Sequence, residues 1–254
     1  MAPKIDFNCD MGESFGAWKM GLDEEVIKHV TSSNVACGYH AGDPVWMQHT
    51  VNLAKDNGVA IGAHPSFPDL LGFGRRNMNT TPEEARAYVK YQVGALQAFL
   101  GGAKLQHVKA HGALYNAAVK NDDLAKGICQ AILDIDPELI LVVLAGTNWV
   151  KIAKEMGNRV AQETFADRAF NADGTLVARS VEGSVLHDPD VVVERSLKMI
   201  TEGSVTAITG EEIPMEADTI CLHGDNPGAV ELASSIRGRF EEAGVQVAPM
   251  GTFC

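Results

Sequence analysis

The chain has 254 residues, of which 46% are hydrophobic and 21% charged, and its formal net charge is −12. This composition is typical of a globular protein, and the length suits one large α/β domain over residues 1–254. The negative charge argues against a nucleic-acid or anionic-membrane surface, although a few local cations can still hold an anionic small substrate.

The sequence predicts no disulfide framework, no secretion signal and no membrane span. Its five cysteines are dispersed and show no CxxC spacing. The first residues, MAPKIDFNCD, lack the apolar stretch of a signal peptide, and no run of about 18 apolar residues occurs. We therefore expect a cytoplasmic protein.

Short apolar runs alternate with helical stretches along the chain. The runs predict strands at 4–8, 33–37, 59–63, 107–110, 139–144, 159–163 and 219–222. Proline-containing start signals predict helices over 44–57, 82–100, 190–202 and 228–243. Between the last two helices, the segment 204–218 has alternating β-branched residues with Gly210 and Pro214, and this predicts a hairpin excursion.

About seven strand–helix units predict a parallel sheet with helices outside it. The sheet is either an open doubly wound sheet or a closed barrel, and in both architectures ligands bind at the carboxyl ends of the strands. Four of the apolar runs stop at a histidine, namely His40, His64, His111 and His223. We therefore expect these four side chains to gather on one rim.

Other polar residues follow the same strands and complete a candidate site. They are Asn8 at the end of the first strand with Asp10 and Glu13 after it, Asp43 after the second, Lys109, Tyr115 and Asn116 around the fourth, Glu163 at the end of the sixth with Arg168 after it, and Asp225 after the seventh. A single histidine at a strand end is more often structural than catalytic. Four at equivalent positions, with carboxylates beside three of them, indicate function.

Two chemistries suit this set of residues. Asp10, His40 and His64 could bind a divalent metal, because carboxylate and imidazole are suitable ligands. Alternatively, the carboxylates and histidines could act as general acids and bases while Lys109 and Arg168 stabilise developing negative charge. The spacing of the residues leaves both open.

The segment FPDLLGFGRRNMN, residues 67–79, is a candidate anion site. Backbone amides at Gly72 and Gly74 and the guanidinium groups of Arg75 and Arg76 could hold a phosphate or a carboxylate. The alternative is a flexible surface loop with solvated arginines. The chain has no GxxxxGK[ST] nucleotide motif and no GxSxG serine motif.

Several longer motifs resemble the LamB/YcsF family, and the resemblance runs from about residue 4 to residue 250. It is seen in IDFNCDMGESFGAW, SSNVACGYHAGDP, GVAIGAHPSFPDLLGFGRR, HVKAHGALYN, ETFADRAF, DGTLVARS and ADTICLHGDNPGAV. The sequence departs from the family pattern at Ala110, where proline is expected, and at Asn226, where threonine is common. Neither departure removes an ionisable group.

The resemblance implies a seven-stranded β/α barrel of the glycoside hydrolase/deacetylase type. It also implies the ATP-dependent 5-oxoprolinase reaction, in which 5-oxo-L-proline is opened to L-glutamate as ATP becomes ADP and phosphate. The ATP would bring Mg²⁺, and the chain would act with two further 5-oxoprolinase subunits, B and C. A stand-alone metal-dependent amidase or carbohydrate deacetylase, and a non-catalytic ligand-binding subunit, are the alternatives.

With this reaction, the candidate residues take specific roles. Asp10, His40 or Asp225 would activate water, and Lys109, His111 and Arg168 would stabilise charge on oxygen. Arg75 or Arg76 would hold phosphate or the substrate carboxylate. The expected catalytic set is Asp10, Lys109, His111, Glu163, Arg168, His223 and Asp225, and the expected binding set is Asn8, Glu13, Asp43, Gly74, Arg75, Arg76, Tyr115 and Asn116.

Overall fold

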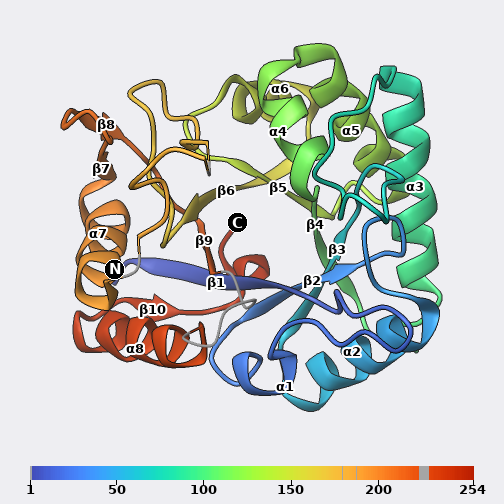
Figure 1. Cartoon of the computed structure of the whole chain (residues 1–254), viewed down its shortest axis with the longest axis horizontal. Coiled ribbons are helices and arrows are strands. Elements are labelled where there is room, and N and C mark those ends of the chain that lie inside the picture. The colour runs from blue at the N-terminus through green and yellow to red at the C-terminus, as the bar shows by residue number, and fades with distance from the viewer. Residues whose placement is uncertain (1, 179, 187, 223–228) are drawn as a thin grey trace.

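The centre of the molecule is a closed barrel of parallel strands (Figure 1). The computed structural model describes residues 2–178, 180–186, 188–222 and 229–254. Around the barrel the strands are β1 (Lys4–Met11), β2 (Ser32–Ala36), β3 (Ala60–His64), β4 (Leu105–Lys109), β5 (Ile140–Leu144), β6 (Arg159–Phe165) and β9 (Thr219–Leu222). Pairing of β9 with β1 closes the ring, so the closed form of the two predicted architectures is present.

All seven predicted strands are present, but two of them are longer than expected. β1 ends at Met11 instead of residue 8, and β6 ends at Phe165 instead of residue 163. Their pairing with β2 and β9 continues through these extra residues. Asp10 and Glu163 therefore lie within strands, where alternate side chains point into the barrel. The predicted ends were too early because strand interiors are usually apolar, so a polar residue is easily taken for the end of a strand.

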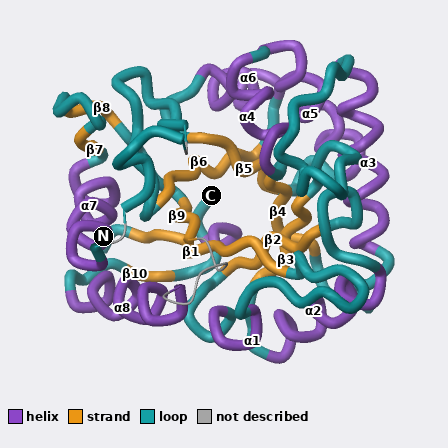
Figure 2. The backbone as a smooth tube through the Cα atoms, viewed as in Figure 1, coloured by secondary structure: helices purple, strands orange, loops and turns teal. Residues whose placement is uncertain are grey.

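Helices surround the barrel on its outside (Figure 2). They are α1 (Asp23–Val26), α2 (Pro44–Asp56), α3 (Pro82–Gln97), α4 (Gly112–Lys120), α5 (Asp122–Ile135), α6 (Asn148–Met156), α7 (Pro189–Glu202) and α8 (Ala229–Glu242). The four predicted helices are present, and each begins and ends within three residues of the expected positions. At α3, the Thr81 and Glu84 side chains each accept from the other's backbone N–H and fix the start.

Four shorter elements lie outside the seven-stranded ring. Within the predicted excursion, β7 (Ser204–Thr206) and β8 (Glu212–Pro214) form an antiparallel pair. β10 (Gln246–Val247) pairs with the beginning of β1. The 3₁₀ helix η1 (Met250–Thr252) covers the amino-terminal end of the barrel, since the Met250 backbone N–H donates to Asp6 near the start of β1.

The barrel interior has an apolar part and a polar part. A large hydrophobic core fills the space between strands and helices, while Ile140, Val142, Ala161 and Met250 form a separate small cluster. The rest of the interior is lined by fully buried polar side chains, namely Asp6, Asn8, Asn34, His107, Glu163 and Thr219. Such groups are stable without water only when they bond to one another, so they form a connected network.

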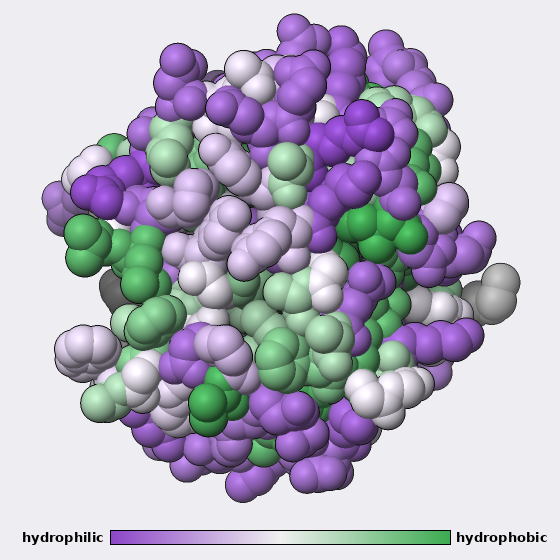
Figure 3. All heavy atoms as spheres, turned by 90° about the vertical axis from the view of Figure 1, so that its right-hand side faces the viewer, coloured by the Kyte–Doolittle hydropathy of each residue, from purple (hydrophilic) through white to green (hydrophobic). Residues whose placement is uncertain are grey.

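The face drawn in Figure 3 carries both hydrophilic side chains and patches of hydrophobic ones. Leu71, Val45 and Trp18 are the most exposed large hydrophobic side chains among the described residues, at 96%, 77% and 76%. Within the same residues, no helix is both long enough and apolar enough to cross a membrane.

Candidate active site

A pocket of about 410 Å³ opens at the carboxyl ends of the strands. This volume lies within the usual range for small-molecule sites. Its acidic lining residues are Asp10, Glu13 and Asp23, and its basic ones are Arg75, Lys109, Lys120 and Arg168. Charged groups of both signs therefore surround a space that suits a small polar ligand.

Lys109 is the last residue of β4 and lies on the pocket floor with 3% exposure. Its Nζ lies 2.7 Å from Glu163 Oε1, 3.0 Å from Asp10 Oδ1 and 3.1 Å from Cys221 Sγ. Burial alone lowers the pKa of Lys109, but the neighbouring Asp10, Cys221 and Glu163 outweigh it and raise the pKa well above the usual value. The side chain is therefore a fixed cation.

Asp10 connects this lysine to a cluster of histidines. Its Oδ1 accepts from Lys109 and, at 2.8 Å, from the Asn34 amide, while its Oδ2 lies 3.3 Å from His64 Nε2. The two oxygens of one carboxylate thus face two different groups. Displacing Asp10 would disturb both.

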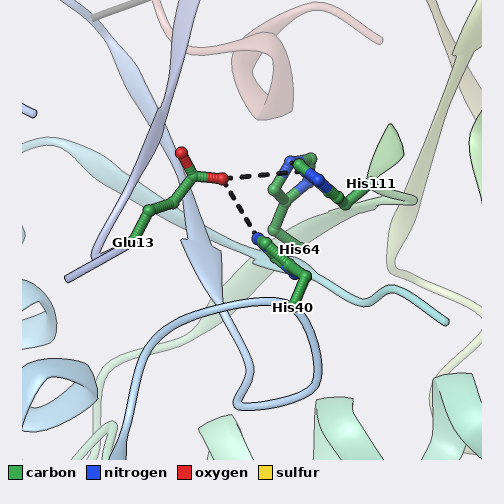
Figure 4. Close-up of side chains that lie close together, drawn as sticks. All are labelled: Glu13, His40, His64 and His111. Atoms are coloured by element: carbon green, nitrogen blue, oxygen red, sulfur yellow. Dashed lines mark hydrogen bonds and ion pairs between the residues drawn. The ribbon is translucent and has the colours of Figure 1, made fainter. Parts of the chain in front are cut away.

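The histidine cluster consists of Glu13, His40, His64 and His111, whose ligand atoms all lie within 4.8 Å of one another (Figure 4). His40 stacks on His111 with ring centroids 3.7 Å apart, and its Nε2 lies 3.0 Å from Glu13 Oε1. Burial, followed by the neighbouring imidazoles, lowers the pKa of both His40 and His111 well below the usual value. The rings are therefore neutral, which is the form that binds metals.

The orientation of two rings indicates what could lie between them. His64 Nδ1 is 2.7 Å from the Lys109 carbonyl oxygen, and His111 Nε2 is 2.9 Å from the Phe73 carbonyl oxygen. A carbonyl oxygen only accepts, so these two nitrogens carry the protons. The remaining nitrogens, His64 Nε2 and His111 Nδ1, face each other at 3.0 Å with their lone pairs. Two lone pairs this close require a proton or a cation between them, and the donor set fits a divalent metal ion.

The loop before Arg75 packs directly on these histidines. Phe73 has a left-handed backbone, with φ of 53°, and its ring contacts His40 and His111 edge-on. The next residue, Gly74, also has a positive φ, and a Cβ there would overlap the Ser66 hydroxyl and approach the His111 ring and the Cβ of His40. A positive φ at a bulky residue is strained and persists only where surrounding contacts impose it. The loop therefore holds His111 in place through the Phe73 carbonyl.

Of the two arginines expected to bind an anion, Arg75 and Arg76, only the first lines the pocket. Arg75 lines the pocket, is exposed, and lies over the Phe73 ring at 5.2 Å. Arg76 instead pairs with Asp69 through its Nε and Nη2 atoms, and it does not line the pocket. Arg75 is therefore part of the site, whereas Arg76 binds Asp69 within the loop.

Among the other expected residues, Arg168 lines the pocket and donates to the carbonyl oxygens of Val177 and Ser184. Tyr115 is a buried lining residue, and burial together with Glu163 raises the pKa of its phenol well above the usual value. Asn116 is exposed at the pocket edge. These three residues and Lys109 therefore share one space.

Asn8 and Asp43 lie away from the pocket surface. Asn8 lies within the barrel, where its Oδ1 accepts from Lys109 Nζ at 3.3 Å. Asp43 caps α2, accepting from the backbone N–H groups of Val45 and Trp46, and it also accepts from Gly16. His223 and Asp225 lie outside the described residues.

The expected metal trio and the cluster in the structure overlap only in part. Asp10, His40 and His64 were expected together, whereas the structure groups Glu13, His40, His64 and His111 and places Asp10 beside His64. Two further residues next to the site, Asn34 and His107, were not predicted: Asn34 donates to Asp10, and His107 bonds to Asn34. Their polarity at inward positions of β2 and β4 was the available signal.

Residues 5–254 match the LamB/YcsF family. The chain belongs to this family. It is 60% identical to the 5-oxoprolinase A subunit of Pyrococcus furiosus over 252 residues, covering 98% of this chain and 99% of that protein. The lactam utilization protein from Thermus thermophilus superposes with a TM-score of 0.92 at 48% identity, covering 96% of this chain and 99% of the other.

The LamB/YcsF barrel also has a more distant structural neighbour. The peptidoglycan deacetylase PdaC from Bacillus subtilis superposes with a TM-score of 0.51 at 12% identity, covering 99% of this chain and 89% of that one. At this identity the likeness concerns the fold alone. The expected β/α barrel of the glycoside hydrolase/deacetylase type is thereby confirmed.

Proposed function

We propose that this chain is the A component of an ATP-dependent 5-oxoprolinase and opens the lactam of 5-oxo-L-proline to L-glutamate together with subunits B and C. Two relatives support the substrate class, one of them a 5-oxoprolinase component and the other a lactam utilization protein. The observation that carries the proposal at the site is Lys109, a buried ammonium that faces a small pocket beside Asp10.

The chemistry explains why such a cation is needed. A lactam is a resonance-stabilised amide, so water alone attacks its carbonyl carbon slowly. Phosphorylation of the lactam oxygen by ATP makes that carbon a better electrophile, and water then adds to it. Opening of the ring and hydrolysis of the acyl phosphate release glutamate and phosphate, so one ATP and two waters are consumed. Negative charge develops on oxygen in these steps, and a fixed cation stabilises it.

The residues around the pocket fit these steps. Lys109 stabilises the oxygen charge, with Arg168 contributing from the same rim, while His111 is held by the Phe73 carbonyl oxygen. Asp10, which lies 3.0 Å from Lys109, is positioned to accept a proton from water. Arg75 holds the substrate carboxylate or a phosphate group at the pocket mouth. ATP enters with Mg²⁺, and because the chain has no GxxxxGK[ST] cradle, its phosphates bind at another kind of site or at an interface with B or C.

A bound divalent cation is part of the proposal. His64, His111 and Glu13 would hold it, with His40 stacked on His111 and Asp10 beside His64. Such an ion polarises a carbonyl or phosphoryl oxygen as a Lewis acid. The carbonyl oxygens of Lys109 and Phe73 keep the rings of His64 and His111 oriented.

The test is a glutamate-release assay with 5-oxoproline on this chain alone and with its B and C partners, with and without ATP. We expect release only with partners and ATP, and we expect Lys109→Met to abolish it. The matched control is Lys104→Met, because Lys104 is exposed and lies five residues away on the same segment.

Three outcomes would change the assignment. Normal turnover by Lys109→Met would remove this residue from the mechanism. Amide hydrolysis by the isolated chain without ATP would favour a stand-alone metal-dependent amidase. Substrate binding with no glutamate formed by the complete complex would favour a ligand-binding subunit.

A further inference from the structure

A chain of hydrogen bonds runs through the barrel from η1 to Lys109, and its direction is fixed at the far end. The Gly251 backbone N–H donates to Gln106 Oε1 at 3.1 Å. A backbone N–H can only donate, so the carbonyl side of the Gln106 amide must face Gly251. The amide nitrogen Nε2 therefore points the other way, into the barrel.

The next link sets the tautomer of His107. Gln106 Nε2 lies 3.1 Å from His107 Nδ1, so this ring nitrogen accepts. A neutral imidazole that accepts at Nδ1 carries its proton on Nε2. That Nε2 lies 2.7 Å from Asn34 Oδ1 and donates to it. Burial, followed by the nearby Lys109, lowers the pKa of His107 to about 3, which keeps the ring neutral.

The last link sets the orientation of the Asn34 amide. Because its Oδ1 accepts from His107, its Nδ2 must face the opposite side, where it donates to Asn8 Oδ1 at 2.7 Å and to Asp10 Oδ1 at 2.8 Å. The same two oxygens also accept from Lys109 Nζ. Each oxygen is thus held from two sides.

We infer that Asn34 and His107 are positioning residues that fix the Asp10 carboxylate and the Lys109 ammonium in their reactive arrangement. This inference rests on the proposed function of that pair. Neither residue lines the pocket, and both are fully buried. In this chain of bonds, Asp10 Oδ1 accepts from Asn34 and from Lys109. Without the Asn34 donor only the bond to Lys109 would remain, and the Asp10 carboxylate could then rotate away from Lys109.

The decisive variant is Asn34→Asp, which keeps the shape and the acceptor for His107 but replaces the donor toward Asp10 with a second carboxylate. In the assembled complex, we expect kcat to fall about 100-fold, since small misplacement of a reacting group costs that much, while KM changes little. The control is Asn158→Asp, because Asn158 is also buried and loses one amide bond, to the Cys129 carbonyl, outside the barrel. It should retain wild-type kcat.

A second variant separates positioning from a general loss of packing. His107→Phe keeps a ring in the space but removes its donor to Asn34, and it should also lower kcat. If His107 acts through Asn34, adding His107→Phe to Asn34→Asp should cause little further loss, whereas independent effects would multiply. Multiplicative losses, or wild-type kcat in both folded single variants, would overturn the inference.

A crystal structure of Asn34→Asp keeps this test separate from that of the proposed function. We expect the separation of Asp10 Oδ1 and Lys109 Nζ, 3.0 Å here, to lengthen beyond hydrogen-bonding range. An unchanged separation would overturn the inference whatever the reaction. If the distance between Asp10 and Lys109 lengthens in Asn34→Asp but the wild-type complex forms no glutamate, only the proposed function is overturned.

Discussion

Gly62 on β3 packs against the imidazole of His107 on β4, and a Cβ at position 62 would overlap the ring nitrogen Nε2. The glycine in AIGAH therefore provides the space in which His107 reaches Asn34. The pairing of β3 with β4 also shifts register between Ile61 and Gly62, at the same place. A small residue in one strand thus permits a polar side chain in the next.

Gly62→Ala should destabilise the fold, because the added methyl group must displace His107 in a closely packed interior. We expect a loss of about 1–3 kcal/mol in the free energy of unfolding, measured with urea. Gly94→Ala is the matched control: it lies in α3, is exposed, and has no described neighbour within 4 Å of the added Cβ. It should stabilise by up to about 1 kcal/mol. If the two variants are equally stable, His107 can move away from the added methyl group at little cost in free energy.

Metal binding by the histidine cluster can be measured without any enzyme assay. Titration of the metal-free protein with Co²⁺ should give the absorption bands of a bound ion, and His64→Ala and His111→Ala should each abolish them. His49→Ala is the control, because His49 lies on α2 with 45% of its side chain exposed. Absence of bands in the wild type would show that a shared proton, and not a metal ion, lies between the two rings.

Substitution of Arg75 and of the adjacent Arg76 should have different effects. Arg75→Ala removes a cation from the pocket lining and should raise KM about tenfold for 5-oxoproline or for ATP with kcat unchanged, because a charged hydrogen bond contributes at least about 1.5 kcal/mol. Arg76→Ala removes the pairing with Asp69 and should leave both KM values unchanged. If both KM values are unaltered in Arg75→Ala, Arg75 binds neither 5-oxoproline nor ATP.

The stability of the fold should depend on pH through Asp6. Burial raises the pKa of Asp6 from 3.8 to about 6, although Ser32, Thr219 and Thr31 donate to its carboxylate. The folded protein therefore holds this proton more tightly than the unfolded chain, so stability falls as pH rises from about 4 to about 6. At about 1.36 kcal/mol per pKa unit, the change is at most about 3 kcal/mol.

Asp6→Asn tests this effect, because an amide cannot ionise. The free energy of unfolding of the variant minus that of the wild type, measured with urea, should increase between pH 4 and pH 7, because only the wild type loses stability through Asp6. The exposed Asp56→Asn is the control for removing one carboxylate from the chain. A difference between Asp6→Asn and wild type that stays constant over this range would contradict the prediction.

The order of strands and the rim at which the chemistry gathers could be predicted from the sequence, because apolar runs that end in polar residues are a local signal. The direct contacts among these polar residues could not be predicted in the same way. Closure of the barrel brings Glu13 and His111 to His64, although loops and strands far apart in sequence supply them. The left-handed backbone at Phe73, which holds His111, follows from tertiary contacts and has no periodic signature.

Helix prediction was limited in the same way. The proline-marked starts of α2, α3 and α7 are local signals, and these helices were predicted. α4 begins at Gly112 without a side-chain cap, and α5 follows it after Asn121, so neither start carries a proline signal. The start of α5 is fixed by Asn121, whose side chain accepts from the backbone N–H groups of Asp123 and Leu124.

The barrel interior contains both an apolar cluster and a network of polar side chains, and the two can change differently during evolution. Ile140, Val142 and Ala161 contact one another through shape alone, so gradual exchange among aliphatic side chains is open to them. The polar side chains of the interior instead share hydrogen bonds, so a single replacement there leaves a neighbouring group without a partner. Mutational drift among descendants should therefore accumulate at these aliphatic positions, while the hydrogen-bonded positions change only by paired exchanges.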